Sequence, residues 1–301
     1  MCGIFAAGLM AISFGGSLYP WHSGRIIGLF ITAGVLIIIF FIQQSFLTSA
    51  SKRLFPVQFL RSPIMVMAFL ATACASTVIF APVYFIPLYF QFVRNDVALQ
   101  AGVRLLPYVV FNVTTAMANG IVMSKKPYYT PWYLFSGVLS VIGSALLYTV
   151  DESTSTAKIY GYSIILGVGG GAFVQLSFTV VQAKVEKHLI PVAIGFCTFA
   201  QLAGPAVALS IANAVFLNEA TDGIAAIAPN LSRQTIQTAI SGVGSHRIEG
   251  LSPEMQEMVL HVIVKAMSKI YFLPLSAGAL TVVMSVFMKR ERLFVRGAGG
   301  H

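Results

Sequence analysis

Charged residues are scarce in this chain of 301 residues. Asp, Glu, Lys and Arg together make up 10% of it, whereas apolar residues make up 57%. A soluble domain carries about 25% charged and about 45–50% apolar residues. The chain therefore has too few charges to cover its own surface in water, and its mean hydropathy of +0.82 is typical of a bilayer protein. This composition excludes a soluble enzyme, a nucleic-acid-binding module and a disordered tail.

Cysteine is also rare, because the chain contains only Cys2, Cys74 and Cys197. These residues lie in separate apolar stretches, with no CxxC spacing and no histidine nearby. The pattern gives little support to a disulfide framework or a metal site, and we interpret all three as packing residues. We predict no metal and no cofactor.

Long apolar stretches from which charge is excluded fill most of the chain. A membrane-spanning helix needs about 20 apolar residues to cross about 30 Å of hydrocarbon. A charge at the bilayer centre costs about 3 kcal/mol or more. The stretches that approach this length contain no Asp, Glu, Lys, Arg or His, and they are 3–18, 26–46, 65–92, 105–123, 132–150, 159–183, 189–218 and 270–288. The sequence therefore predicts an all-α polytopic membrane protein with about eight transmembrane helices.

The basic residues predict an orientation. With the C-terminus in the cytoplasm, the cytoplasmic segments hold 11 Lys and Arg residues, and the short opposite loops hold four. This bias follows the positive-inside rule, and eight spans place the N-terminus in the cytoplasm too. The net charge of +9 then lies on the cytoplasmic face, where anionic lipid attracts it and no nucleic acid is needed. We predict a multi-pass protein of the plasma membrane, with the lipid bilayer as its partner.

One long polar loop, 219–269, lies on the predicted outer side. Within it, Ser252-Pro253-Glu254 has the pattern of a helix start. Apolar residues then recur every three or four positions, so we expect an amphipathic helix on the outer membrane surface, as a structural lid or, alternatively, in contact with substrate. Asn230 in Asn230-Leu231-Ser232 is a predicted glycosylation site. A second amphipathic stretch, 54–60, suits the inner surface.

Proline and glycine occur inside several predicted spans. Proline removes a backbone hydrogen bond from a helix, and glycine lets two helices approach closely. The glycine run 167–171 lacks the preceding strand and the later acidic residue of a dinucleotide site. We interpret these positions as packing contacts first and as hinges of a moving bundle second. They are Pro82, Pro87, Pro107, Gly167, Gly169, Gly204 and Pro205.

Uncharged polar side chains recur inside four of the predicted spans, mostly three, four or seven residues apart, so that they share a helix face. An amide that faced lipid would lack a hydrogen-bond partner. For each residue alone, an interhelical hydrogen bond of about 0.6 kcal/mol is a sufficient explanation. Four polar faces together indicate a shared substrate cavity, to which phenylalanines such as Phe80 and Phe111 would add apolar contacts. The candidates are Tyr84, Gln91, Asn112, Thr115, Asn119, Gln175, Thr179, Gln182, Gln201 and Asn213.

No carboxylate or histidine lies within a predicted span. Proton-coupled transport usually needs such a group inside the membrane. Either the coupling group lies on a part of the protein outside this chain, or the chain is not proton-driven by itself. The same absence makes a membrane enzyme the least favoured class, and we predict no catalytic residue.

Several short motifs occur in a fixed order along the chain. They are Gln100-Ala101-Gly102-Val103-Arg104-Leu105-Leu106-Pro107, Tyr129-Thr130-Pro131, Gly161-Tyr162, Gly167-x-Gly169, Val181-Gln182, Pro191-Val192-Ala193-Ile194-Gly195 and Phe199-x-Gln201-x-x-Gly204. Together they resemble the carboxyl-terminal portion of fungal fourteen-span multidrug antiporters of the major facilitator superfamily. The resemblance covers about 3–292. It implies that 1–62 contains the two helices between two six-helix bundles plus a cytoplasmic amphipathic segment, that 63–292 is the second bundle, and that 293–301 is a cytoplasmic tail.

Members of that family export small hydrophobic compounds, such as drugs, toxins or secondary metabolites, in exchange for protons. The resemblance thus implies efflux of a small hydrophobic substrate, with protons coupled through an amino-terminal half that is absent here. The turn Ser124-Lys125-Lys126-Pro127 departs from the family by placing proline where glycine is expected. Two alternatives stay open: an uptake permease, such as a siderophore-iron transporter, and a non-transporting truncated membrane protein.

Overall fold

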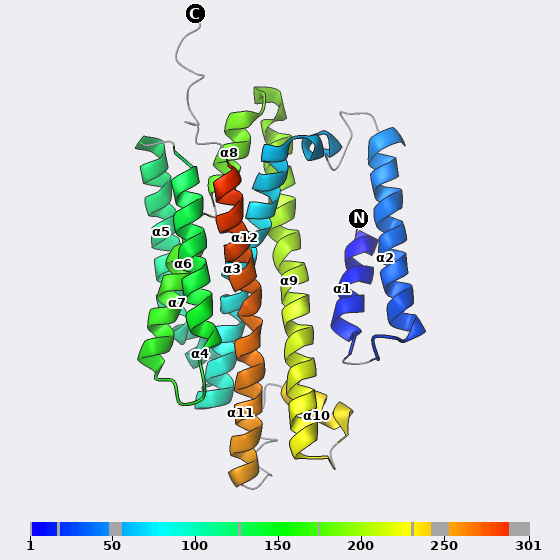
Figure 1. The fold of residues 1–301 in the computed structure, drawn as a ribbon, viewed down its shortest axis with the longest axis vertical. Coiled ribbons are helices and arrows are strands. Elements are labelled where there is room, and N and C mark those ends of the chain that lie inside the picture. The colour runs from blue at the N-terminus through cyan, green and yellow to red at the C-terminus, as the bar shows by residue number, and fades with distance from the viewer. Residues whose placement is uncertain are drawn as a thin grey trace, which may run out of the picture.

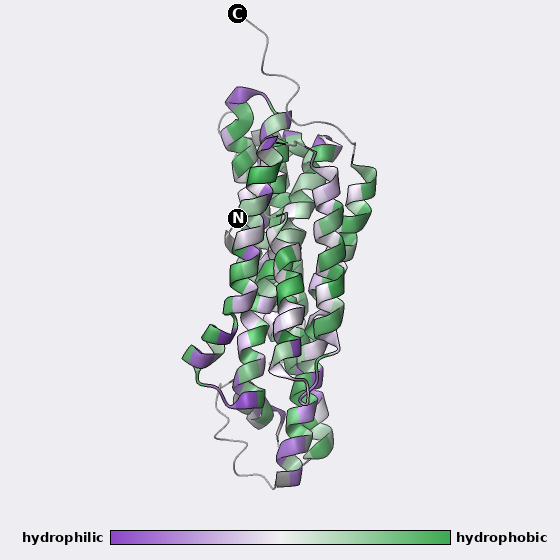
Figure 2. Ribbon diagram, turned by 90° about the vertical axis from the view of Figure 1, so that its left-hand side faces the viewer, coloured by the Kyte–Doolittle hydropathy of each residue, from purple (hydrophilic) through white to green (hydrophobic). Residues whose placement is uncertain are grey.

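The computed structural model describes residues 2–16, 19–47, 56–125, 128–173, 175–229, 232–241 and 253–288. The described part is a bundle of roughly parallel and antiparallel helices (Figure 1). Seven of its helical stretches are long and apolar enough to cross a membrane, and a shorter apolar helix precedes them. Hydrophilic residues gather toward the two ends of the bundle, with mostly apolar residues between (Figure 2). The predicted all-α polytopic fold is confirmed.

The first two helices form a hairpin beside the rest of the bundle (Figure 1). They are α1 (Cys2–Phe14) and α2 (Gly24–Ile42), and α2 continues into a π-helical turn, Gln43–Leu47. The first helix is shorter than the predicted span 3–18, because a tight turn follows it at Gly15 and Gly16. Gly16 has a φ of 74°, a left-handed conformation that favours glycine.

A short 3-10 helix, Val57–Arg61, precedes the main bundle. It covers part of the predicted amphipathic stretch 54–60, whose first two residues lie outside the described ranges. The helices of the main bundle are α3 (Pro63–Arg94), α4 (Ala98–Arg104), α5 (Leu106–Lys125), α6 (Thr130–Tyr148), α7 (Thr156–Gly171), α8 (Leu176–Lys184), α9 (Ile190–Ile227), α10 (Arg233–Ser241), α11 (Pro253–Ile270) and α12 (Phe272–Phe287).

Helix α3 lies at the centre of this bundle, in contact with α7, α8, α9, α11 and α12. It ends at Arg94, where Asn95 takes a left-handed conformation with a φ of 52°. Asp96 then forms an ion pair with Arg104, the last residue of α4, so the chain turns back into α5. Helix α5 packs mainly on α7 at one side of the bundle, and α1 contacts α9 at the other (Figure 1).

Prolines have different roles in these helices. Pro82, Pro87 and Pro205 lie inside helices that stay continuous, α3 and α9. Pro107 is the second residue of α5, so it starts that helix and does not interrupt a span. The first turn of a helix tolerates proline, because its N–H groups have no intrahelical partner.

The described residues of the predicted outer loop, 219–269, are largely helical. Helix α9 continues to Ile227, α10 follows, and α11 stands end to end with α12, separated from it only by Tyr271 (Figure 1). The apolar face of α11, including Val259 and Ile263, is buried against neighbouring helices, chiefly α9. The amphipathic helix thus finds a protein partner for its apolar face and does not lie flat on the membrane surface.

Candidate functional site

One membrane span is interrupted near its middle. Thr156–Lys184 is long enough to cross the bilayer, but α7 ends at Gly171 and α8 begins at Leu176. The last turn of α7 is rich in glycine, which has a low helix propensity. Where a helix ends, its final carbonyl groups lose their intrahelical partners. Inside a membrane these groups must be satisfied by the protein itself.

Amide side chains from α5 reach the carbonyl groups of this segment. The Asn112 Nδ2 donates a hydrogen bond to the Gly167 carbonyl at 3.2 Å. Asn119, which is 2% exposed, donates to the carbonyl of Ala172, the residue that follows α7. Both asparagines therefore bind the backbone of α7 and its end, which stabilises the interruption.

Hydroxyl side chains from α6 hold the same segment from another side. The Ser136 Oγ donates to the Gly169 carbonyl at 2.7 Å. The Tyr133 hydroxyl lies 2.8 Å from the Ser177 Oγ in the first turn of α8, and both side chains are buried. Sequence reasoning missed these residues. The signal that could have found them is the spacing of Ser136, Ser140 and Ser144, four residues apart on one face of α6.

The predicted packing glycines lie where two helices touch. A Cβ on Gly167 would lie 2.7 Å from the Tyr108 carbonyl oxygen of α5, and one on Gly169 would lie 2.8 Å from the Ser140 amide nitrogen of α6. A Cβ on Gly204 of α9 would lie 2.9 Å from the Ala73 Cα of α3. No larger side chain fits at these contacts unless the backbones separate. A hinge role for the same positions stays a prediction.

The other predicted cavity residues are spread over several helix faces. Two of them bond to backbone of their own segment: the Gln91 Nε2 donates to the Pro87 carbonyl at 3.3 Å, and the Thr179 Oγ1 donates to the Gln175 carbonyl at 3.0 Å. Three are exposed, with Tyr84 at 52%, and three are half-buried. The exposed ones are Tyr84, Gln175 and Gln182, and the half-buried ones are Thr115, Gln201 and Asn213.

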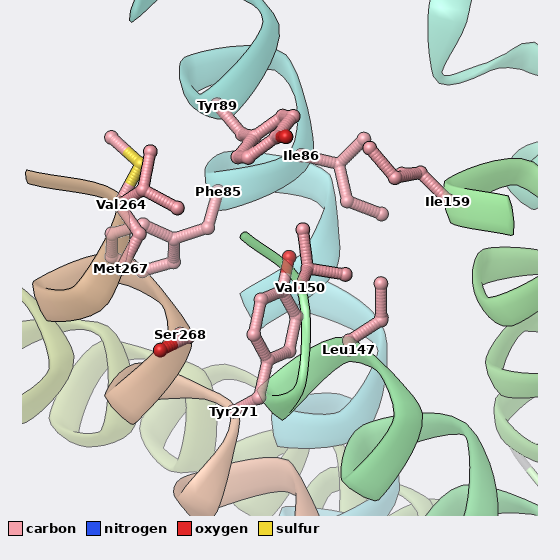
Figure 3. Close-up of a pocket in the computed structure, with 10 residues that line it drawn as sticks. All are labelled: Phe85, Ile86, Tyr89, Leu147, Val150, Ile159, Val264, Met267, Ser268 and Tyr271. Carbon is pink, nitrogen blue, oxygen red and sulfur yellow. The ribbon is translucent and has the colours of Figure 1, made fainter. Parts of the chain in front are cut away.

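Three cavities occur at other places in the described part of the bundle. The smallest, about 20 Å³, lies between α3, α6, α7 and α11 and is lined mainly by apolar side chains, with Tyr89 and Tyr271 on opposite sides (Figure 3). It has room for about one water-sized molecule. An apolar groove of about 480 Å³ runs between α3, α9 and α12. The largest, about 630 Å³, joins the α1–α2 turn to α9 and α10. None of the three is lined by a predicted cavity residue, so the shared substrate cavity stays a prediction.

Charged groups lie near the end of the bundle that carries α10. In the turn between α6 and α7, hydrogen bonds from the Ser153 and Thr154 hydroxyls lower the pKa of Asp151. The His261 Nδ1 of α11 lies 2.8 Å from the Glu152 Oε1, and this contact lowers the pKa of Glu152. The described residues contain no group of three His, Cys, Asp or Glu side chains that could hold a metal ion.

Comparison with known proteins shows similarity along almost the whole chain. No family model matches it. The MFS-type transporter pgmG of Aspergillus terreus is 50% identical over 302 residues, which cover 100% of this chain and 52% of that protein. The efflux pump alnA of Emericella nidulans is 42% identical over 98% of this chain, and the efflux pump patC of Aspergillus clavatus is 39% identical over 96%.

The chain spans about half the length of the curated relatives it matches, with 54% of alnA and 53% of patC covered. The match agrees with the described fold, an all-α bundle with an additional helical hairpin. The resemblance expected from the sequence motifs is confirmed: the chain belongs to the major facilitator superfamily and corresponds to the carboxyl-terminal portion of a fungal transporter of that superfamily.

Proposed function

We propose that this chain forms the carboxyl-terminal bundle of a transporter that exports small hydrophobic compounds. The observation that carries the proposal is the match of almost the whole chain to relatives named as efflux pumps. The proposal assigns α3 to α12 to the second bundle and the α1–α2 hairpin to the pair of helices between the bundles. Transport then requires a first bundle, because alternating access moves one bundle against another around a site between them.

The interrupted span is the part of the bundle best suited to movement. Helix α8 has nine residues. Two described backbone bonds at its junction with α7 reach only three residues back, from the Phe173 N–H to the Gly170 carbonyl and from the Leu176 N–H to the Phe173 carbonyl. In this proposal, α8 tilts against α7 at these turns. The Asn112 and Asn119 amides hold α7, whereas Tyr133 holds α8 through Ser177. In this proposal, α7 is the fixed half of the span and α8 the moving half.

The proposed substrate contacts combine exposed amides with exposed aromatic rings. Gln182 of α8, Gln175 just before α8 and Tyr84 of α3 are exposed on a bundle whose other surface is mostly apolar. Phe80 and Phe111 are each 43% exposed and would supply apolar contacts. A site with a few hydrogen-bonding groups among apolar side chains suits a small hydrophobic compound. The opposite wall would come from the first bundle.

Proton coupling would come from the first bundle as well. The middle stretches of the described spans contain no acidic residue or histidine, so this chain offers no group there that could bind and release a proton. We place both termini in the cytoplasm of a cell whose plasma membrane holds the transporter, in accord with the distribution of basic residues. Asn230 lies outside the described residues, and we propose it as a glycosylation site on the outer side.

The test is a chimaera in which residues 1–301 replace the matching portion of the Aspergillus terreus relative. The chimaera is produced in a host cell that lacks its own efflux pumps, and retention of a hydrophobic fluorescent dye is measured with and without a proton gradient. We expect gradient-dependent export by the chimaera and none by the chain alone.

Matched variants make the test specific to the proposed contacts. Gln182→Leu removes an exposed amide from α8 and is expected to slow export, whereas Gln100→Leu makes the same change on α4 and is expected to have no effect. Gradient-dependent export by the isolated chain would contradict the proposal, as would an inactive chimaera that reaches the membrane in normal amounts.

A further inference from the structure

The largest cavity described above lies away from the predicted substrate contacts. It has a volume of about 630 Å³, within the range of about 300–1,000 Å³ that is common for small-molecule sites. Its three walls come from segments far apart in the sequence: the turn between α1 and α2, the end of α9, and α10. Helix α10, which forms one of these walls, lies at one end of the bundle (Figure 1).

The first wall is aromatic and is built around Trp21. A Cβ on Gly15 would collide with the six-membered ring of Trp21, and a Cβ on Gly16 would lie 2.6 Å from the Trp21 Nε1. The two glycines thus let the indole pack directly on the turn while 44% of Trp21 stays exposed. Beside it, the Tyr19 hydroxyl accepts a hydrogen bond from the Arg25 Nη1 at 2.6 Å, and the Arg25 guanidinium lies 4.8 Å from the Tyr19 ring centre. These contacts fix the position of both rings.

The other two walls present amides and one ion pair. Asn218 and Asp222 lie four residues apart on the same face of α9. Helix α10 packs on α9 with Ile236 buried and turns Arg233 and Gln234 toward the cavity. Arg233 forms an ion pair with Asp222 across the gap between the two helices. The formal charges of Asp222 and Arg233 therefore cancel each other, and the described lining contains one further ionisable side chain besides tyrosine, His22.

This lining determines the kind of ligand that fits. A planar ring can stack on the exposed face of Trp21. Asn218 and Gln234 carry amides that both donate and accept hydrogen bonds, so they can bind hydroxyl or carbonyl groups on such a ring. An ionic ligand would enter a site whose charges already neutralise each other. We propose that this cavity binds an uncharged planar ring compound that carries hydroxyl or carbonyl groups. The site stands independently of the proposed transport function.

The two tryptophans of the chain allow a direct test. Trp21 lines the cavity, whereas Trp132 lies near the start of α6, whose first residues are at the opposite end of the bundle. The full chain is labelled with 5-fluorotryptophan in detergent, and Trp132→Phe assigns the two fluorine NMR signals. The probe is methyl 3,5-dihydroxybenzoate, an uncharged hydroxylated ring. We expect its addition to shift the Trp21 signal saturably and to leave the Trp132 signal in place.

Matched probes and variants separate binding from partition into detergent. Methyl benzoate lacks the hydroxyl groups, and 3,5-dihydroxybenzoate is charged. Each is expected to bind at least about tenfold more weakly than the dihydroxy ester. Gln234→Leu is expected to raise the midpoint of the Trp21 shift about tenfold, and Gln100→Leu, the same change on α4, is expected to leave it unchanged. Gln234 is exposed on a surface helix, so its replacement leaves the fold intact, which the Trp132 signal reports.

Three results would overturn the proposal. One is the absence of a saturable Trp21 shift up to the solubility limit of the dihydroxy ester. Another is an equal response to methyl benzoate or tighter binding of the charged probe. The third is a midpoint that Gln234→Leu does not change.

Discussion

Helix α2 and the interrupted span of α7 and α8 are both apolar enough to cross a bilayer, yet they are packed very differently. In the most apolar part of each span, 11% of the residues are buried for α2, against 65% for α7 and α8. Helix α2 is rich in isoleucine and phenylalanine, whereas the end of α7 is rich in glycine. Lipid solvates large apolar side chains as well as a protein core does. The burial of these side chains between helices is therefore associated with little gain in free energy. In this bundle, small residues and backbone hydrogen bonds decide which helices are buried.

Glycines of α2 and of α6, the helix that packs on α7, show the same difference at single positions. Nothing lies within 4 Å of a Cβ built on Gly28 or Gly34 of α2. On the packed side, a Cβ on Gly143 of α6 would lie 2.7 Å from the Leu166 amide nitrogen of α7. Glycine is therefore a packing residue only where another part of the chain, backbone or side chain, approaches it.

The largest effect is expected from Gly143→Val. The added side chain would overlap the α7 backbone, which cannot move aside as a flexible side chain can, so we expect a loss of about 3 kcal/mol of stability or more. Thermal unfolding of the purified protein in detergent measures it. Gly34→Val on α2 is the matched control, with an expected change below about 0.5 kcal/mol. Equal destabilisation by both substitutions would contradict the conclusion that Gly143 is closely packed and Gly34 is not.

A smaller loss is expected from Asn119→Leu. The substitution keeps the approximate size of the side chain but leaves the Ala172 carbonyl without its donor, at a cost of about 1–2 kcal/mol. Hydrogen exchange measured by mass spectrometry should then rise around the junction of α7 and α8. The control is Thr114→Val on the exposed face of α5, where the hydroxyl bonds only to Val110 of its own helix. If exchange at the junction is the same in both variants, Asn119 does not brace it.

The contact between Glu152 and His261 should make a small, pH-dependent contribution. The hydrogen bond lowers the pKa of Glu152 from its ordinary value near 4.5, so the stabilisation is present above that value and is lost as pH falls through the lowered pKa. Both side chains are partly exposed, so solvent screening keeps the effect below about 1 kcal/mol. The melting temperature of the original chain should exceed that of Glu152→Gln at pH 6, and the difference should shrink as pH falls below 4.5. A difference that stays constant over this fall in pH would exclude this contact as the cause.

The smallest effect is expected from Ile38→Ala in α2. Ile38 is 61% exposed to the surroundings of the bundle, and its truncation removes few protein contacts. We expect a change within about 0.5 kcal/mol in thermal unfolding, whereas a buried isoleucine truncated in the same way loses about 2–5 kcal/mol. Ile263→Ala in α11, where the side chain is 1% exposed, is the matched buried substitution. Similar losses of stability at both positions would show that Ile38 of α2 is packed against protein, contrary to its exposure in the structure.

The positions of most spans could be predicted from the sequence. The predicted stretch 65–92 lies inside α3, Pro63–Arg94, because charged residues mark the ends of membrane helices. The interruption after Gly171 could not be predicted, since a glycine run is compatible with either a continuous packed helix or a break. The roles of Ser136 and Tyr133 of α6 as hydrogen-bond partners of this segment could not be predicted either. A serine hydroxyl in a membrane helix often bonds to its own backbone, and only the packing of α6 against α7 shows that Ser136 bonds to Gly169 instead.

The end-to-end arrangement of α11 and α12 has a mechanical consequence. One residue, Tyr271, joins a helix that projects beyond the bundle to a helix inside it. The buried face of α11 packs on α9, so α11 and α12 can rotate together about that contact. A sideways push on the exposed face near Glu254 or Glu257, by a bound antibody or a neighbouring protein, would be transmitted to α12 as a tilt. Helix α11 thus connects a surface near the end of the bundle with α12 inside it.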